Sequence, residues 1–306
     1  MRRIMLLTPV FAFVIGVYAQ TEKQVQKNFA VQPGGLLTVE ADRGSIEIKT
    51  GTDNTVDVDV TFRLRAGTDE RLERLLAEYD LDIRQSGKDV IVTLDRKGSG
   101  GWGRAHDRLN VKFRIRVPSE YNVDLRTSGG GISVEDLRGF VDAKTSGGSL
   151  KFGNITGPVK GHTSGGSISV AGCQGNVDVR TSGGSLSLGK VEGTLNARTS
   201  GGSITVDEIA GDVDARTSGG SITVSLSKQP KTGCSLATSG GGITVHLAEN
   251  IGVTVDARTS GGGVSTDFPV TVQGNISKNS LNAEINGGGP RLHLRTSGGS
   301  IRIRKM

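Results

Sequence analysis

Short alternations of apolar and polar residues recur along most of this chain at a nearly constant interval. In one such unit, Val141, Ala143 and Thr145 alternate with charged residues, which predicts a strand with one buried face. A Ser-Gly-Gly-Ser segment follows, and its two glycines predict a sharp corner with positive φ. Leu150 and Phe152 then resume the inward alternation and predict a second short strand.

The tetrad Thr-Ser-Gly-Gly marks the same point in each unit. The copies begin at Thr127, Thr145, Thr163, Thr181, Thr199, Thr217, Thr238, Thr259 and Thr296. The first six copies are 18 residues apart, the next two steps are 21 residues, and the last step is 37. A fixed period near 20 residues with short strand patterns is typical of stacked repeats. The sequence therefore predicts an all-β fold, a β-solenoid with rungs of about 18 residues over residues 119–306.

Stacking these rungs in chain order aligns similar residues into columns. The column after the glycine corner is aliphatic: Ile132, Leu150, Ile168, Leu186, Ile204, Ile222, Ile243, Val264 and Ile301. One rung cannot bury its apolar side alone, whereas the stack can. The inward threonines need hydrogen-bond partners, and we expect a ladder of hydroxyl groups between neighbouring rungs. The structural corners are assigned to Gly129, Gly130, Gly147, Gly148, Gly165, Gly166, Gly183, Gly184, Gly201, Gly202, Gly219 and Gly220.

The first third of the chain does not carry the repeat. Residues 37–48 have the pattern of a degenerate first rung. Apolar alternation predicts strands at three further places, residues 56–64, 90–94 and 109–117. Leu72, Leu76 and Tyr79 have helical spacing and predict one short helix. We interpret residues 20–118 as a strand-rich cap that blocks one open end of the stack.

The N-terminus has the pattern of an export signal. Arg2 and Arg3 precede an apolar run over residues 4–17, and residues 17–19 (Val-Tyr-Ala) form a small-residue cleavage site. We predict that residues 1–19 are a signal peptide. The apolar run is too short to favour a membrane span, and no later stretch of the sequence is apolar over the length that a span requires. The mature protein is therefore expected in the periplasm, outside the cell or on its surface.

Composition and charge narrow the picture further. Aromatic residues make up 4% of the 306 residues and glycine accounts for 47 of them, which favours a thin aliphatic core. The formal net charge of +6 falls to +4 when Arg2 and Arg3 are removed. Because basic residues alternate with acidic ones, the charge does not indicate a nucleic-acid partner.

The two cysteines are predicted to be free and buried. Cys173 and Cys234 each replace an aliphatic residue of an inward column, and the two columns differ. The cysteines lie about three rungs apart, and at about 4.8 Å per rung this exceeds the reach of a disulfide. Both are therefore expected to act as small hydrophobic residues.

Several motifs give the chain a family resemblance. They are Pro33-Gly34-Gly35, Gly44-Ser45-Ile46, Val117-Pro118, Asn286-Gly287-Gly288-Gly289 and Thr296-Ser297-Gly298-Gly299-Ser300-Ile301. With these motifs the chain resembles the bacterial adhesin-type family with β-strand repeats, a domain family of unknown function. The resemblance covers nearly all of the mature chain. It implies an exported or envelope-associated β-solenoid and brings no catalytic residues.

The outward side of the repeat strands carries one organised feature. A basic column precedes the threonines and consists of Arg126, Lys144, His162, Arg180, Arg198, Arg216, Arg258 and Arg295. An acidic column lies two residues earlier and includes Asp124, Asp142, Asp178, Asp214 and Asp256. One interpretation is a solvated lattice of ion pairs, each worth roughly 0–1 kcal/mol. The other is a repetitive surface that binds an anionic glycan or envelope polymer through many weak contacts.

An enzymatic function has less support in the sequence. The four histidines are scattered, and we expect neither a metal nor a cofactor. The carboxylates are spread one to a rung beside a basic residue, which suits a lattice better than a catalytic pair. We therefore expect a non-enzymatic exported binding or structural module. A polysaccharide-active β-helix enzyme is the alternative.

Overall fold

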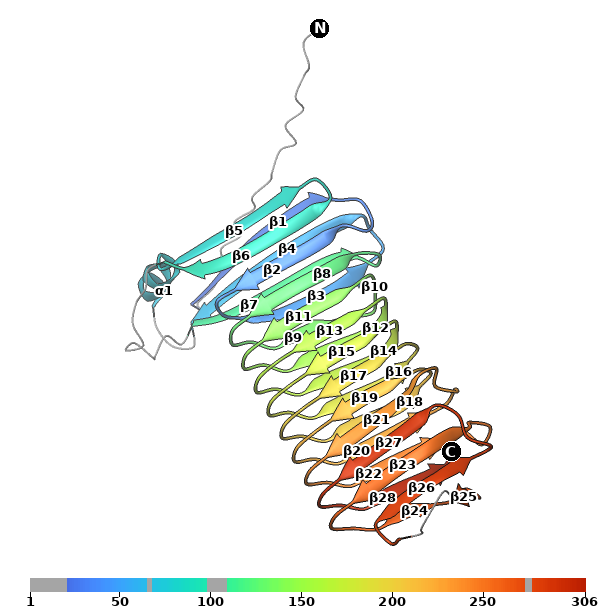
Figure 1. Ribbon diagram of the computed structural model, residues 1–306. Coiled ribbons are helices and arrows are strands. Elements are labelled where there is room, and N and C mark those ends of the chain that lie inside the picture. The colour runs from blue at the N-terminus through green and yellow to red at the C-terminus, as the bar shows by residue number, and fades with distance from the viewer. Residues whose placement is uncertain (1–20, 65–67, 98–108, 273–276) are drawn as a thin grey trace.

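The computed structural model contains two long β-sheets that face each other across one continuous core (Figure 1). It describes residues 21–64, 68–97, 109–272 and 277–306. The predicted all-β solenoid with one short helix is confirmed. The predicted signal peptide over residues 1–19 lies outside the described residues.

Within the described residues, each sheet has 14 strands. In spatial order, sheet 1 contains β1 (Glu22–Ala30), β4 (Thr55–Leu64), β7 (Leu109–Pro118), β3 (Ser45–Gly51), β9 (Ile132–Val134), β12 (Leu150–Thr156), β14 (Ile168–Gln174), β16 (Leu186–Val191), β18 (Ile204–Ile209), β20 (Ile222–Leu226), β22 (Ile243–Leu247), β28 (Ile301–Lys305) and β24 (Val264–Thr266), while β10 (Leu137–Arg138) pairs with β12. Sheet 2 contains β5 (Tyr79–Ser86), β6 (Asp89–Arg96), β2 (Leu36–Ala41), β8 (Asn122–Thr127), β11 (Val141–Thr145), β13 (Val159–His162), β15 (Val177–Arg180), β17 (Leu195–Arg198), β19 (Val213–Arg216), β21 (Gly233–Thr238), β27 (Arg291–Thr296), β23 (Val253–Thr259), β26 (Ser280–Ile285) and β25 (Thr271–Val272).

The central rungs stack in parallel with a register of one repeat. Val141 pairs with Val159 in sheet 2, and Leu150 pairs with Ile168 in sheet 1. Their side chains are at most 1% exposed, because residues of the two sheets fill the narrow space between them. The predicted aliphatic columns of the central rungs are therefore confirmed, and the period of two along each strand sends the intervening residues outward.

The Thr-Ser-Gly-Gly corner is built differently from the prediction. In the described part of the chain, none of its glycines has a positive φ, whereas Gly139 (φ 148) and Gly157 (φ 142) at the opposite corner do. The second glycine is instead required by close packing between rungs. A Cβ atom placed on Gly184 would lie 2.1 Å from the carbonyl oxygen of Gly166 in the preceding rung.

The inward threonines bond to backbone atoms and not to one another, so the predicted hydroxyl ladder is wrong. Thr181 donates through Oγ1 to the carbonyl oxygen of Gly166 at 2.7 Å, and the N–H of Gly184 donates to Thr181 Oγ1 at 3.3 Å. The same donation to a carbonyl recurs in all nine copies of the motif. Each threonine thereby satisfies its hydroxyl inside the core and connects its corner to that of a neighbouring rung.

The N-terminal residues continue the two sheets. The degenerate first rung, β2–β3, pairs with β8–β9 on one side and with β6–β7 on the other. The outermost pairs, β1 with β4 and β5 with β6, are antiparallel and close this end. The helix α1 (Asp69–Leu76) buries Leu72 and Leu75, but Tyr79 is the first residue of β5 and does not extend the helix.

The C-terminal rungs are not stacked in chain order, contrary to prediction. The last rung, β27–β28, lies between β21–β22 and β23–β24, so Thr296 is flanked by Thr238 and Thr259 (Figure 1). Beyond this interleaved rung, β26 pairs antiparallel with β23 and closes the edge of sheet 2. The 37-residue step between the last two motifs thus contains a returning strand.

Both cysteines are free and buried, as predicted. Burial raises the pKa of each thiol to about 11, so few thiolates form near neutral pH. We expect neither Cys173 nor Cys234 to react with iodoacetamide in the native protein at pH 8, and both to react after denaturation. Mass spectrometry of the two samples checks this. Rapid labelling of the folded protein would contradict the burial.

Candidate polymer-binding face

The outward side of sheet 2 brings the predicted basic residues together. Moving along the stack, it carries Arg126, Lys144, His162, Arg180, Arg198, Arg216, Ala237, Arg295 and Arg258 in consecutive rungs. Arg180, Arg198 and Arg216 occupy three adjacent strands, as predicted. Ala237 of β21 lies between Arg216 and Arg295, and its short side chain leaves one gap in the column.

Ion pairs hold part of this column in place. Arg180 makes two hydrogen bonds of 3.1 Å to Asp178, while Arg198 and Arg216 share Asp214 at 3.0 and 2.9 Å. These arginine side chains remain 42–56% exposed, so each pair contributes roughly 0–1 kcal/mol to stability. Ion pairs of the kind that the lattice interpretation predicts are therefore present in these rungs, and they leave the guanidinium groups accessible.

The face carries a surplus of positive charge. From β8 to β23 its outward positions hold nine basic residues, which are Arg126, Lys144, Lys160, Arg180, Arg198, Arg216, Arg258, Arg291 and Arg295. Five carboxylates oppose them, Asp124, Asp142, Asp178, Asp214 and Asp256, which leaves four positive charges in excess.

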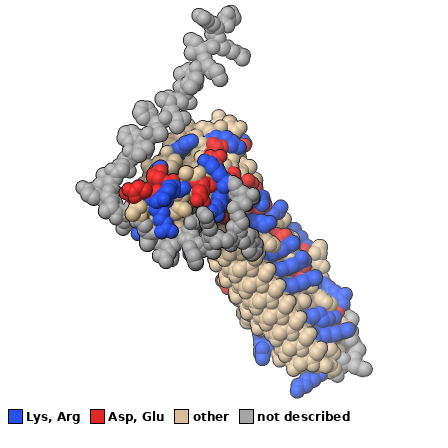
Figure 2. Space-filling view, turned by 90° about the vertical axis from the view of Figure 1, so that its left-hand side faces the viewer, with Lys and Arg blue, Asp and Glu red and all other residues tan. Residues whose placement is uncertain are grey.

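The outward side of sheet 1 has a different composition. In adjacent strands its outward positions include Ser169, Ser187, Thr205, Thr223 and Thr244. Figure 2 shows Lys and Arg gathered along one side of the solenoid beside a broad strip without charged side chains.

Asp256 is the most enclosed carboxylate of this face. Its side chain is 10% exposed and accepts two bonds of 2.8 Å from Nη2 of Arg295, as well as a bond from Arg291. Nε of Arg258 lies 3.7 Å away and Nδ1 of His293 lies 3.4 Å away. Burial alone would raise the pKa of Asp256, but the hydrogen bonds from Arg295 and Arg291 outweigh it and lower the pKa to about 2. Burial and the charge of Arg295 lower the pKa of His293.

The low pKa of Asp256 predicts a pH-dependent contribution to stability. Because the pKa falls from 3.8 when unfolded to about 2 when folded, the contribution is present above pH 4 and is lost as the pH falls towards 2. We expect Asp256→Asn to lower the free energy of unfolding by about 2 kcal/mol at pH 7. The difference from the wild type should shrink to a small fraction of this at pH 2. Urea denaturation at pH 7, 4 and 2 measures it, and a constant difference would contradict the assignment.

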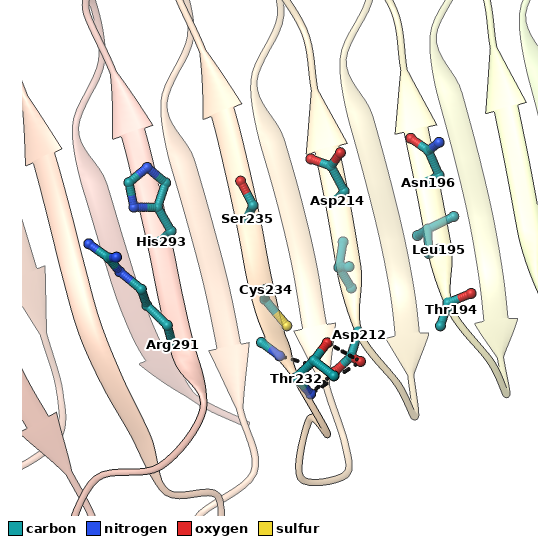
Figure 3. Close-up of a pocket in the computed structure, with 12 residues that line it drawn as sticks. Thr194, Leu195, Asn196, Asp212, Asp214, Thr232, Cys234, Ser235, Arg291 and His293 are labelled. Atoms are coloured by element: carbon teal, nitrogen blue, oxygen red, sulfur yellow. Dashed lines mark hydrogen bonds between the residues drawn. The ribbon is translucent and has the colours of Figure 1, made fainter.

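A groove of 660 Å³ lies on this face beside the basic column and is lined by residues of β17, β19, β21 and β27 and of the loops before them. Its floor contains Gly233, Cys234 and Ser235 of β21, and neighbouring rungs supply the two sides (Figure 3). Arg291 and His293 stand on one side, whereas Asp214 and Asn196 stand on the other (Figure 3). The outward residues of β21 that line the groove, Gly233 and Ser235, have small side chains and leave this space open.

One end of the groove is shaped by the loop before β21. Asp212 accepts hydrogen bonds from the backbone N–H groups of Lys231 and Thr232, at 2.7 and 3.0 Å, and from the hydroxyl of Thr232 at 2.7 Å (Figure 3). These bonds lower the pKa of Asp212, although burial opposes them. The loop before β21 is thus held by Asp212, and Thr232 lines this end of the groove.

Sequence reasoning missed the groove and Arg291. The signals were present, since residues 233, 235 and 237 interrupt the charged columns and Arg291 stands two residues before an outward histidine. No cluster of three or more His, Cys, Asp or Glu suited to a metal ion occurs in the described ranges. Among those residues, no helix combines the length and apolar composition needed to cross a membrane.

Comparisons with known proteins give a family. The model of the family described as Toastrack DUF4097 matches residues 36–304. No curated protein matches the chain. A solved structure of a "putative adhesin" from Bacteroides fragilis is 14% identical, with 93% of this chain and 97% of that chain covered and a TM-score of 0.38. A second protein so described, from Parabacteroides distasonis, is 12% identical, with coverages of 92% and 97% and a TM-score of 0.41.

Proposed function

This chain belongs to the Toastrack DUF4097 family, and from this premise we propose that it is an exported, non-enzymatic module that binds an anionic polymer at the cell envelope. The proposed contact surface is the outward side of sheet 2. The charged, apolar and small-residue pattern of residues 1–19 supports export.

The observation that carries the proposal is the unbroken row of Arg180, Arg198 and Arg216 within a face of net positive charge. Neighbouring strands lie about 4.8 Å apart, so the row presents a positive group at each step. A polymer with regularly spaced anionic groups can engage several arginines at once, and weak contacts then add through multivalency. The partner carboxylates reduce the local potential, so high avidity requires a long polymer.

Binding is favoured over cleavage by the state of the carboxylates. Asp178, Asp214 and Asp256 each accept hydrogen bonds from arginines of the same face. A cleaving pair would require two carboxyl groups with different pKa values placed on either side of one bond. The row of alternating charges instead suits recognition of a repeated charge.

The triple variant Arg180→Gln/Arg198→Gln/Arg216→Gln tests the proposal. We expect it to fold with little loss of stability, because the pairs that it removes are exposed. We expect it to lose most of its retention in affinity electrophoresis on polygalacturonate at low salt. Wild-type retention should decrease as the ionic strength rises.

A matched control removes the same charge elsewhere. In Lys151→Gln/Lys228→Gln/Arg302→Gln, three exposed basic residues outside the outward side of sheet 2 are replaced. This variant should be retained like the wild type. Equal losses of retention in both triple variants would show that net charge alone causes the retention. If the wild type is not retained by polygalacturonate at low salt, the proposal for this face is wrong.

A further inference from the structure

We infer that the groove across β21 binds a short segment of an acidic saccharide and holds one of its carboxylates. The inference rests on the proposed function, because it names the unit of an acidic glycan that this face recognises. It differs in place from the row of arginines, because none of Arg180, Arg198 and Arg216 lines it. Its lining residues come from the adjacent strands β17, β19, β21 and β27, so a bound segment lies along the stack, beside the basic column (Figure 3).

The dimensions suit a few sugar rings. The rungs on either side of β21 are two strand spacings apart, about 10 Å. The outward lining residues of the intervening strand, Gly233 and Ser235, have small side chains that leave this width open. A volume of 660 Å³ lies within the usual range for small-molecule sites. Elsewhere in the central repeat, longer side chains such as Arg180 and Asp178 occupy the equivalent positions.

Arg291 supplies the group for the carboxylate. Its side chain is 65% exposed, lines the groove and bonds to Asp256 through one terminal nitrogen. A guanidinium has five N–H donors, so others are left for a second carboxylate. Asp256 is shared by Arg291, Arg295 and Arg258, which leaves two positive charges in excess on this side of the groove.

The other side and the end of the groove suit sugar hydroxyl groups. Asp214 and Asn196 present carboxylate and amide groups, and Ser235 and Thr232 present hydroxyls. Asp214 is paired with Arg198 and Arg216, whereas Asp212 accepts hydrogen bonds from backbone N–H groups and from Thr232. The negative charge of Asp212 disfavours a compact multivalent anion such as phosphate, whereas the hydroxyl groups of a saccharide can donate to both carboxylates. The groove therefore favours a saccharide, which offers one carboxylate to Arg291 and hydroxyl groups to the other side, over a bare anion.

Titration with trigalacturonate by isothermal calorimetry at low salt tests the inference. We expect the wild type to bind and Arg291→Gln to bind about tenfold more weakly, because a charge-assisted hydrogen bond is lost. Ser235→Trp fills the groove without a change of charge, and we expect it to abolish binding. The matched controls Lys151→Gln and Thr223→Trp make the same changes outside the groove and should bind as the wild type does. Far-ultraviolet circular dichroism verifies that every variant is folded.

The outcomes separate this inference from the proposed function. A wild type that is retained by polygalacturonate but does not bind trigalacturonate, or binds it equally well in Ser235→Trp, overturns the groove site and leaves the arginine row standing. Groove-dependent binding of trigalacturonate, with unchanged polymer retention in the Arg180/Arg198/Arg216 variant, supports the groove and overturns the row. Equal affinity for a neutral trisaccharide, or for inorganic phosphate, would overturn the assignment of an acidic saccharide.

Discussion

Gly184→Ala is expected to lower the free energy of unfolding by about 3 kcal/mol or more. The new Cβ atom would lie 2.1 Å from the carbonyl oxygen of Gly166 and 2.4 Å from its carbon. Both neighbours are backbone atoms, so no side chain can move aside, and the rungs must separate. Their separation also strains the hydrogen bond from Thr181 to the same carbonyl. Urea denaturation of the wild type and variant measures the loss.

Two neighbouring substitutions are the controls. A Cβ atom on Gly183 would lie 3.1 Å from the nearest atom, so Gly183→Ala should cost about 1 kcal/mol or less. Ser182 is exposed, and Ser182→Ala should be nearly neutral. Equal losses at residues 183 and 184 would show that close approach between rungs does not decide the choice of glycine.

A chain that ends at Gly289 is expected to lose the order of residues 249–289 while the rungs before them stay folded. The deletion removes β27 and β28, which are the strands that connect β23 and β24 to the rest of both sheets. In a stack where each rung contacts only its neighbours, the loss stops at the break. Hydrogen–deuterium exchange should show fast exchange in β23 and β26 and unchanged protection in β13 to β19.

The control for this truncation ends the chain at Arg304. It removes Lys305 and Met306, which are partly or fully exposed, and leaves both ladders of β28 nearly complete. We expect this shorter deletion to preserve the protection of the C-terminal rungs. Persistent protection of β23 in the chain that ends at Gly289 would refute the interleaved order.

The central rungs could be predicted because two signals agree there. The period of two along a strand sets which residues face inward, and the 18-residue repeat sets which residues align. The two periods together predict that Val141 pairs with Val159 and that Arg180 pairs with Arg198. These contacts follow from local pattern alone, and the structure confirms both.

The ends of the stack could not be ordered from the same signals. Every rung presents the same threonine and aliphatic columns, so Thr296 matches Thr238 as well as it matches Thr259. Only the antiparallel return of Ser280–Ile285 makes the last rung lie inside, and no repeat pattern marks it. The corner prediction was wrong for a related reason: a glycine tolerated at positive φ and a glycine required by a neighbouring backbone look identical in a sequence.

The candidate site was predictable in part. The charged columns could be read from alternation, and their members lie on one face. The groove depends on the small outward side chains of β21 and on the loop before this strand, where Asp212 holds Thr232. Gly233 and Ala237 were visible as exceptions, but their consequence appeared only once Arg291 was placed beside Gly233.

The interleaved last rung also changes how the protein would bear a mechanical load. A pull on the C-terminus reaches β28 first, and this strand is held by β22 on one side and by β24 on the other. In a stack that ended in chain order, the terminal rung would have one neighbour and would peel away bond by bond. Here extraction of β28 must break two ladders at once, so the C-terminal strand resists a pulling force better than a strand with one neighbour would.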